Sequence, residues 1–565
     1  MRWTLQPKAD VNKVQHIQEA LGVSTFVATL LVQRGIETFE EARDFFRPQL
    51  SHLHNPYLMK DMEKAVNRVE QAIANGENIL VYGDYDVDGT TAVSLMSSYL
   101  LSIYPNVATY IPDRYNEGYG VSYLGIDFAY DNDISLIIAL DCGIKAVEKV
   151  AYANERGIDF VICDHHRPGD TVPNAVAVLD PKQEDCNYPY DELCGCGVGF
   201  KLIQALAANR NQTIDDLIPY LDLVATAIAA DIVPITGENR VLCYYGLKVI
   251  NSFPRVGIKA LIGELKKKEL TVTDVVFIIA PRINAAGRME HGQHAVNLLT
   301  ETDAAQAAFF AKDIEEYNAN RRSLDEQITQ EALAQIIELE EENHSTTVVY
   351  NESWHKGVIG IVASRLTETY FRPTLVFTKS GEKLAASARS VPGFDVYNAL
   401  EACADCIEQF GGHKYAAGLT LLPEKYEAFK AKFEAVVKAT IDAKLVTPEI
   451  KIDAVLPLEA VTAKFYRILK QFAPFGPMNM TPVFMTEQVT DTGWGKPVGE
   501  TGDHLRLVLD APLPNERKSL TAIGFGLGDK YSLITNKRPF SLAYTIDENE
   551  WQGAVSLQLR VKDLK

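Results

Sequence analysis

Short apolar runs alternate with longer amphipathic segments through the first half of the chain. Five runs are apolar almost throughout, at residues 78–82, 107–111, 135–140, 160–163 and 176–178. Continuous apolar runs of this length are typical of parallel strands that are covered on both faces. The segments between them, including 91–104 and 145–156, have helical periodicity. The pattern predicts an α/β fold, a doubly wound domain around a parallel sheet.

The pattern changes twice in the second half of the chain. Residues 303–342 are rich in Ala, Glu and Gln and contain no Pro or Gly, and as one helix they would span ~60 Å. A second, smaller α/β unit follows, and from residue 448 strand-like alternation predicts a small β-barrel. We therefore divide the chain into an N-terminal helical cap (1–50), the doubly wound domain (51–300), a connecting helix (301–345), the smaller α/β domain (346–445) and the β-barrel domain (446–565).

Composition narrows the classes of function. The 565 residues are 47% hydrophobic, which is typical of a globular protein. With no run of eighteen apolar residues and no apolar signal region, we expect a cytoplasmic protein. The net charge of −20 argues against a nucleic-acid-binding protein in general. However, carboxylates that bind metal ions lower the net charge without repelling phosphate once the ions are bound.

Three aspartates follow the first apolar run. Asp84, Asp86 and Asp88 stand at alternate positions before a predicted helix. Alternate spacing in an extended segment would aim three carboxylates to one side. Divalent cations would relieve their mutual repulsion. The alternative is a solvated acidic turn in which Thr90 or Thr91 caps the helix.

Two further strands end in the same way. Asp141 follows the run at 135–140, and Asp164-His165-His166 follows the run at 160–163. Another acidic residue, Asp231, follows the apolar segment 224–230. Because the carboxyl ends of parallel strands meet at one edge of a sheet, we expect these side chains to converge there.

A set of carboxylate and imidazole ligands favours manganese or magnesium over structural zinc. Two such ions can activate a water molecule and stabilise the leaving oxygen in the cleavage of a phosphodiester or phosphoanhydride. Zinc bound by thiolates is the alternative, although a Cys-x-Cys pair is atypical and buried thiols are favoured. The cysteines concerned are Cys194, Cys196, Cys403 and Cys406.

The motifs resemble those of a known superfamily. Asp-Tyr-Asp-Val-Asp-Gly at 84–89, Leu-Asp-Cys-Gly at 140–143 and Asp-His-His at 164–166 resemble, in this order, the DHH phosphoesterase superfamily. Further segments resemble the RecJ family of bacterial single-strand-specific exonucleases. They lie at 112–120, 231–235, 238–240, 281–289, 354–365, 387–395 and 411–418.

The resemblance implies a DHH domain, a DHH-associated domain and an oligonucleotide-binding (OB) fold. It also implies a single-stranded-DNA-specific exonuclease of DNA repair and recombination, which removes 5′-mononucleotides in the 5′→3′ direction. Two Mn²⁺ or Mg²⁺ ions are the implied cofactors. Single-stranded DNA is the implied partner, and a single-stranded-DNA-binding protein and a helicase are further candidates. We expect a monomer that has no membrane segment.

The resemblance also assigns roles to residues of this chain. The implied metal ligands are Asp86, Asp88, Asp141, His165 and Asp231. Asp141 would bridge the two ions, Asp84 would lie beside them, and His166 would contact the scissile phosphate as a catalytic group. The residues implied to bind DNA or its 5′-phosphate are Arg114, Arg282, Arg288, Ser387, Arg389 and His413.

The chain departs from the family pattern in one loop. Where the family reads Pro-Phe-Gly-x-Gly-Asn-Pro, residues 474–480 have Met478 for the second Gly and Met480 for the last Pro. This change puts the loop conformation in doubt. In the β-rich domain we expect Trp494 and Trp551 to pack in the core, with base stacking as the alternative.

Two other functions stay open at this point. One is a DHH phosphodiesterase that acts on short oligoribonucleotides or cyclic dinucleotides, against which the β-rich domain and the long connector speak. The other is a catalytically inactive replication factor that binds single strands. Such a protein is expected to lose metal ligands, whereas every expected position is filled here.

Overall fold

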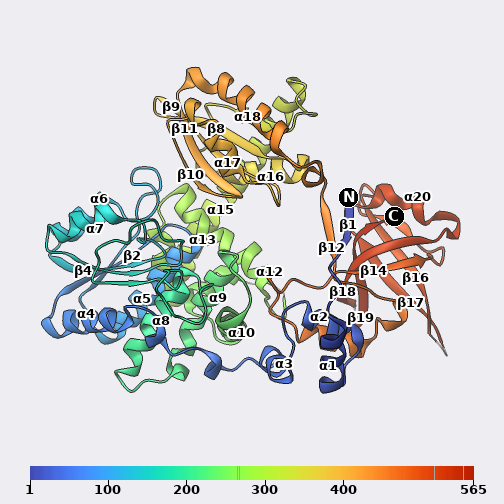
Figure 1. Cartoon of the computed structure of the whole chain (residues 1–565), viewed down its shortest axis with the longest axis horizontal. Coiled ribbons are helices and arrows are strands. Elements are labelled where there is room, and N and C mark those ends of the chain that lie inside the picture. Colours follow the sequence, from blue (N-terminus) through green and yellow to red (C-terminus); the bar gives the residue numbers. More distant parts are fainter. Residues whose placement is uncertain (264, 266, 514–515, 552) are drawn as a thin grey trace.

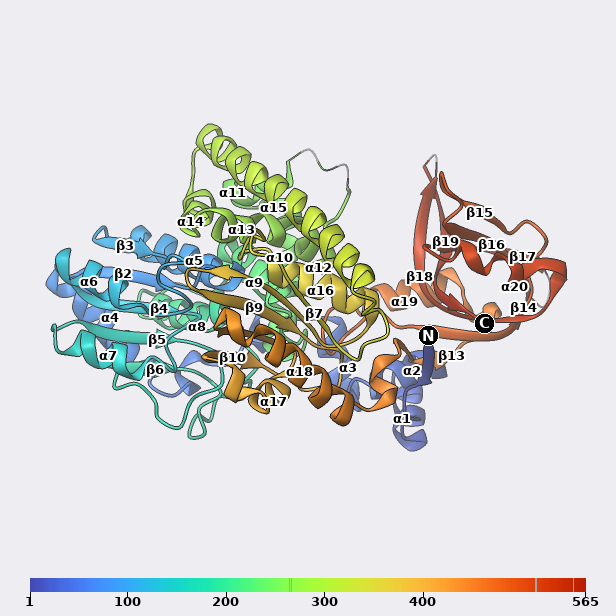
Figure 2. The ribbon, with the colours of Figure 1, turned by 90° about the horizontal axis from the view of Figure 1, so that it is seen from above.

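The chain folds into three lobes, which Figure 1 shows as two α/β domains and a β domain that carries the N-terminal helices. The computed structural model describes residues 1–565 except 264, 266, 514, 515 and 552. None of the helices in this described part is long and apolar enough to cross a membrane. The two α/β domains lie against each other, and the β domain stands to one side of both (Figure 2).

The first α/β domain is built on a five-stranded parallel sheet in the order β3-β2-β4-β5-β6. Its strands are β2 (Asn78–Gly83), β3 (Val107–Tyr110), β4 (Ile134–Leu140), β5 (Asp159–Cys163) and β6 (Ala177–Leu179). One face packs against α4 (Met62–Asn75), α5 (Val87–Ile103) and α8 (Gly195–Ala208), and the other against α6 (Tyr123–Asp131) and α7 (Val147–Asn154). The predicted doubly wound fold is confirmed, with each expected strand within one residue or two of its place.

A group of helices completes this domain and leads to the connector. They are α9 (Leu221–Ala230), α10 (Gly237–Ser252), α11 (Val256–Ile262), α12 (Val272–Asp274), α13 (Ala280–Met289) and α14 (Gln293–Thr300). The single helix α15 (Ala304–Glu338) follows, as Figure 2 shows. Its apolar residues join two cores, because Ala307 and Ile314 pack in the first domain and Ile328 and Ile336 pack in the second.

The second α/β domain has a mixed sheet in the order β10-β11-β9-β8-β7. Its strands are β7 (Thr347–Tyr350), β8 (Thr374–Ser380), β9 (Lys383–Arg389), β10 (Gln409–His413) and β11 (Ala416–Leu421). Only β7 and β8 pair in parallel. The helix α16 (Ile359–Tyr370) packs with α15 on one face, and α17 (Val396–Glu401) and α18 (Tyr426–Thr440) pack on the other.

The C-terminal domain is a seven-stranded sheet in the order β13-β14-β18-β19-β17-β16-β15. Its strands are β13 (Ala454–Val455), β14 (Phe484–Val489), β15 (Lys496–Val498), β16 (His504–Leu513), β17 (Glu516–Gly524), β18 (Phe540–Trp551) and β19 (Ala554–Leu564), with the helices α19 (Ala463–Lys470) and α20 (Tyr531–Ile534). Alternate residues such as Leu505, Leu507 and Leu509 fill its core. The strand alternation thus buries one face of the sheet.

The N-terminal residues belong to the core of this C-terminal domain. They form α1 (Val11–Leu21), α2 (Thr25–Val32) and α3 (Phe39–Phe46), and the apolar faces of α1 and α2 share one core with the β strands. The first residues, expected to be helical, instead form β1 (Arg2–Leu5), which pairs in parallel with β12 (Glu449–Ile452). Local periodicity could not reveal this strand, because the partner that β1 has among the described strands lies more than 440 residues away.

Candidate metal centre

The segment after β2 carries three aspartates, but it is not the extended strand that the alternate spacing predicted. Asp84 directly follows the strand, Asp86 caps α5 by accepting a hydrogen bond from Gly89 N (3.0 Å), and Asp88 lies in the first turn of the helix. The helix therefore begins one turn earlier than expected. The turn is tight enough to require Gly89, because a Cβ there would lie 2.3 Å from the Asp84 carbonyl oxygen.

The N-terminus of helix α8 binds the carboxylate of Asp88. The two oxygens of Asp88 accept hydrogen bonds from Gly195 N (2.6 Å) and Cys196 N (2.7 Å). Free N–H groups at a helix N-terminus stabilise a negative charge. A Cβ at Gly195 would lie 2.5 Å from Cβ of Asp141, so the glycine also lets the helix approach a second aspartate. We did not expect this role for Gly195 from the sequence.

The strand ends bring four of the expected metal ligands together. Nε2 of His165, after β5, lies 3.2 Å from Oδ1 of Asp141, which follows β4. The same nitrogen lies 3.6 Å from Oδ2 of Asp231 and 3.8 Å from Oδ2 of Asp88. In the described part of the chain, two groups of three potential ligands have atoms within 4.8 Å of one another. They are Asp141, His165 and His166, and Asp88, His165 and Asp231.

Several buried atoms of this cluster have no hydrogen-bond partner among the described residues. They are Oδ2 of Asp84, Oδ1 of Asp141, and Nδ1 and Nε2 of His165. Unpaired buried polar atoms are costly in a folded protein unless an unseen group satisfies them. Carboxylate oxygens and imidazole nitrogens are ligands of Mn²⁺ and Mg²⁺. The residues therefore fit a divalent metal ion.

The pKa values of the cluster agree with a need for positive charge. Burial, followed by repulsion from Asp86, raises the pKa of Asp84 to about 8 and that of Asp88 to about 7. Burial and then Asp88 raise the pKa of Asp231 to about 8. Burial also lowers the pKa of His165 to about 3, so this imidazole is neutral and free to bind a metal. Bound cations would favour the charged form of these carboxylates and so lower their pKa values again.

His166 is held differently from His165. Its Nδ1 lies 2.8 Å from Oδ1 of Asp164, which also accepts the backbone N–H groups of both histidines. Burial opposes protonation of His166, but the hydrogen bond to Asp164 and the charges of Asp164, Asp231 and Asp88 together outweigh it and raise the pKa to about 9. On the other side of the ring, Nε2 lies 3.1 Å from the hydroxyl oxygen of Tyr119. The sequence showed Asp164 within a motif, but its role and that of Tyr119 appear only in the structure.

Guanidinium groups from both α/β domains gather beside the cluster. Burial, followed by repulsion from Arg114, Arg389 and Arg321, lowers the pKa of Arg288 to about 9. Burial and then Arg114 lower the pKa of Arg389, whose Nη1 donates to Oγ of Ser387 (3.1 Å). Cations this close repel one another unless an anion lies between them. The arrangement suits a phosphate group.

Two other residues expected to bind DNA lie apart from these guanidinium groups. Arg282 forms an ion pair with Glu315 of α15 (2.6 Å) and donates to the Ile278 carbonyl. His413 ends β10 and is exposed. Burial and then repulsion from His166 lower the pKa of His413. The structure thus brings together Arg114, Arg288, Ser387 and Arg389.

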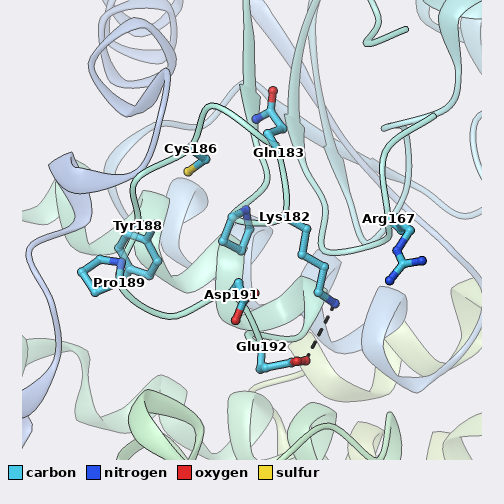
Figure 3. A pocket seen from close by; sticks show the side chains of 9 residues that line it. Arg167, Lys182, Gln183, Cys186, Tyr188, Pro189, Asp191 and Glu192 are labelled. Carbon is cyan, nitrogen blue, oxygen red and sulfur yellow. Dashed lines mark ion pairs between the residues drawn. The ribbon is translucent and has the colours of Figure 1, made fainter. Parts of the chain in front are cut away.

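A cavity of about 560 Å³ lies beyond β5 and β6, next to the residues that follow His166. Figure 3 shows Arg167 and Lys182 at its wall, with Lys182 paired to Glu192 at 4.0 Å. Cysteines are absent from both potential ligand groups found among the described residues. Instead, Sγ of Cys194 accepts a hydrogen bond from Gly197 N and caps α8. This contact supports the reading of Cys194 as a structural thiol.

The fold and the site define a DHH phosphoesterase. The chain matches the models of the DHH family, N-terminal domain (residues 78–228), the DHHA1 domain (343–439) and the RecJ OB domain (452–563). It is 36% identical to the single-stranded-DNA-specific exonuclease RecJ of Bacillus subtilis, over all of this chain and 70% of the relative. It is 32% identical to Escherichia coli RecJ over 95% of both chains. The chain therefore belongs to the RecJ family.

Solved structures agree with this assignment. RecJ from Thermus thermophilus in complex with Mn²⁺ superimposes with a TM-score of 0.85 at 27% identity, over all of this chain and 79% of that one. The Mg²⁺ complex of the same protein gives a TM-score of 0.79 at 26% identity. The OB domain and the overall fold expected from the sequence are confirmed. The limits chosen at residues 50, 300, 345 and 445 stay predictions.

Proposed function

We propose that this protein is a metal-dependent exonuclease that degrades single-stranded DNA from its 5′ end to 5′-mononucleotides, with Mn²⁺ or Mg²⁺ as cofactor. One observation carries the proposal: the ends of β4 and β5, the first turn of α5 and the end of α9 bring Asp141, His165, Asp88 and Asp231 together and leave buried ligand atoms without a partner among the described residues. The RecJ relatives supply the substrate class by their names.

Each polar residue of the centre then has a role. Asp88, Asp141, His165 and Asp231, together with Asp86, would hold the metal ions, and Asp84 would lie beside them. The metal ions, when bound, supply an activated water and charge stabilisation of the leaving oxygen. Asp164 fixes the ring of His166 through Nδ1 and keeps it protonated. The Nε2–H of His166 can then donate to a non-bridging oxygen of the scissile phosphate.

We infer that the guanidinium groups recognise the end of the strand. Arg114, Arg288 and Arg389 come from a loop, from α13 and from β9, so only the assembled pair of α/β domains forms this group. A terminal 5′-phosphate is the anion that would separate these cations. We expect Arg389→Ala to lose the preference for 5′-phosphorylated over 5′-hydroxyl strands, measured as the ratio of kcat/KM. An unchanged ratio would remove Arg389 from this role.

The C-terminal domain offers a surface for the rest of the strand. Lys496, Arg506 and Arg560 lie in one row across β15, β16, β17 and β19, because their register partners share a face of the sheet. The guanidinium of Arg560 lies 5.3 Å from the ring of Phe525, which is exposed. Cations interleaved with an aromatic ring suit a single strand. We propose that this face, the OB face, binds the DNA that has not yet entered the cleft.

The sequence predicted that the two tryptophans of this domain pack in its core. Trp494 is 77% exposed and therefore does not pack in the core as expected. It stands just before β15, so it is available to stack on a base. The side chain of Trp551 lies outside the described residues.

Labelled substrates test the proposed function directly. Single strands and duplexes labelled at the 5′ or 3′ end are incubated with Mn²⁺, and products are followed over time. We expect single strands to be shortened from the 5′ end and duplexes to remain. A folded Asp141→Ala variant should lose several orders of magnitude in rate, because Asp141 is the residue that we expect to bridge the two metal ions. Shortening from the 3′ end would contradict the polarity, and near-normal activity of the variant would contradict the metal centre.

We further propose that the protein works in the cytoplasm, as a monomer, in DNA repair and recombination. Its eight cysteines are free thiols, which suits a reducing compartment. A helicase and a single-stranded-DNA-binding protein are the partners we propose, since an exonuclease restricted to single strands needs duplexes to be opened and exposed strands to be presented. Light scattering and pull-down from a native extract would test these proposals.

A further inference from the structure

The loop at residues 474–480, which we call the joint loop, lies between the first α/β domain, the N-terminal helices and the C-terminal domain. Asn479 is buried and organises it: its amide nitrogen donates to the carbonyls of Phe472 and Pro474, both at 2.8 Å. Its amide oxygen accepts from Nε of Arg34, at the end of α2 (2.8 Å). Arg34 also donates to the Met480 carbonyl. The loop is therefore fixed to the N-terminal helices.

Arg240 of α10 fixes the same region from the side of the first α/β domain. Its buried guanidinium donates to the carbonyls of Phe472 (2.9 Å) and Ala473 (2.9 Å), just before the joint loop. It also donates to the carbonyl of Phe45 and lies 3.8 Å from the centre of that ring. One side chain thus connects three parts of the molecule. The orientation of the C-terminal domain relative to α10 depends on these contacts.

The joint loop touches the segment that carries a proposed metal ligand. Ile235 N donates to the Pro477 carbonyl (2.8 Å). The side chain of Ile235 is buried so closely against Gly476 that a Cβ there would lie 2.5 Å from its Cγ1. Asp231 stands four residues before Ile235, at the end of α9. The backbone between Asp231 and Ile235 is therefore held by α9 at one end and by the joint loop at the other.

This short segment has an unfavourable backbone conformation. Ile232 has φ = 62° and is 66% exposed. A β-branched residue seldom adopts the left-handed region, and it does so only where the surrounding structure imposes it. The exposed side chain of Ile232 makes no core contact that would impose it. Toward the C-terminus this segment is held at three places: Val233 packs in the core of the first domain, the Pro234 carbonyl accepts from Nδ2 of Asn239 (3.1 Å), and Ile235 contacts the joint loop.

We propose that the joint loop positions the Asp231 carboxylate for metal binding and so couples the seating of the C-terminal domain to the metal centre. Gly476 and Ile235 are positioning residues in this proposal, and neither touches the substrate. Any displacement of the loop at Gly476 is passed to Ile235 by direct contact and then along four residues to Asp231. The proposal rests on the proposed function only in taking Asp231 as a metal ligand.

A pair of compensating substitutions tests the coupling in the full-length protein. Gly476→Ala adds a methyl group that pushes on Ile235, and Ile235→Ala removes Cγ1 and Cδ1, the nearest atoms it meets. We expect Gly476→Ala to weaken Mn²⁺ binding by about 10- to 100-fold, the usual effect of disturbing a residue that supports a metal ligand. The double variant should recover most of this loss. Met480→Ala, in the same loop with an exposed side chain, is the matched control and should bind Mn²⁺ normally.

Three measurements make the result decisive. Calorimetry gives the Mn²⁺ affinity, thermal unfolding reports stability, and kinetics on a short oligonucleotide separate kcat from KM. We expect Gly476→Ala to lower kcat while KM stays near its normal value. Wild-type Mn²⁺ affinity in Gly476→Ala, or a double variant as weak as Gly476→Ala, would overturn the proposal. Failure of the proposed function looks different, because Asp231→Ala would then leave Mn²⁺ binding intact in an otherwise unaltered chain.

Discussion

Asp164 and His166 form the most polarised pair of the centre. Burial raises the pKa of Asp164, but the hydrogen bond and charge of His166, with the backbone N–H of Ile144, lower it to about 2. Burial lowers the pKa of His166, but the hydrogen bond and charge of Asp164, with the charges of Asp231 and Asp88, raise it to about 9. At neutral pH the imidazole is therefore a cation that faces a site for phosphate. By contrast, the adjacent His165 is neutral because of burial. The two neighbouring histidines thus differ in charge because His166 forms a hydrogen bond to the ionised Asp164, whereas burial decides the charge of His165.

We expect Asp164→Asn to lower kcat by about 10- to 100-fold, because an amide supports the imidazolium less well than a carboxylate does. The pKa of His166 should fall toward its ordinary value. Activity that depends on protonated His166 is lost as the pH rises through this pKa, so the alkaline limb of the pH–rate profile should move to lower pH. An alkaline limb at the wild-type position would contradict the assigned role. His166→Ala, for comparison, should impair turnover more than Mn²⁺ occupancy.

Met478 occupies a position where the family pattern has Gly. The backbone at Met478 is left-handed, with φ = 61°. The departure from the family pattern therefore produces local backbone strain at this residue. A non-Gly residue with a left-handed backbone destabilises the fold by about 1–2 kcal/mol. Replacing it with Gly removes this strain, but part of the gain is offset because Gly loses more conformational entropy on folding. We expect Met478→Gly to raise the free energy of unfolding by about 1 kcal/mol, measured by urea denaturation. Met480→Gly should give no such gain, since its φ is not positive.

At the scale of elements, the N-terminus of α8 organises the centre as much as the strands do. Its first N–H groups bind Asp88, and its first residue allows Asp141 to approach. The strands bring the aspartates to one edge of the sheet, and α8 then fixes the orientation of one of them. The site therefore depends on the packing of a helix that contributes no metal ligand.

Replacing Gly195 tests this dependence. We expect Gly195→Ala to lose Mn²⁺ binding and hydrolysis, because the new Cβ would meet Cβ of Asp141 at 2.5 Å. Gly197→Ala is the matched control two residues further along the helix, where a Cβ has only ordinary contacts from 3.4 Å. Calorimetric titration with Mn²⁺ and circular dichroism would separate lost metal binding from lost helix. Equal Mn²⁺ affinities in the two variants would contradict the role of Gly195.

At the scale of the whole molecule, the proposed function divides catalysis and strand binding between lobes. The two α/β domains provide the metal centre and the guanidinium groups, and the OB face stands on a separate lobe (Figure 1). The N-terminal helices share the core of that lobe. A truncation near residue 445 would consequently strip the N-terminal helices of their core, so the division of labour is better tested by surface substitutions.

The variant Lys496→Ala/Arg506→Ala/Arg560→Ala removes the cations of the OB face without touching the core. We expect weaker binding of long single strands and a salt dependence reduced by about 2 in the slope of log K against log[salt], since each phosphate contact contributes about 0.7. Hydrolysis of a very short oligonucleotide should be unchanged. Filter binding at several salt concentrations gives the slope. A wild-type slope would assign the C-terminal domain to a structural role or to partner docking.

The sequence by itself determined the local elements and the chemistry that directly follows them. Continuous apolar runs revealed the strands of the first sheet, and Asp141 and the Asp164-His165-His166 segment stood out because each follows such a run. The same edge of a parallel sheet collects all carboxyl ends, so their convergence followed from topology. Asp86 and Asp88 were found for the same reason, although the helix around them was placed one turn too late.

Only the tertiary structure decided which distant residues complete the site. The pairing of β1 with β12, the contact of Gly195 with Asp141, the gathering of Arg114, Arg288 and Arg389, and the contact of Ile235 with Gly476 join segments far apart in the chain. Hydrophobic periodicity indicates which face of a helix or strand is buried, but it does not indicate which other element packs against that face. These contacts depend on close packing between elements, which a single residue pattern does not encode.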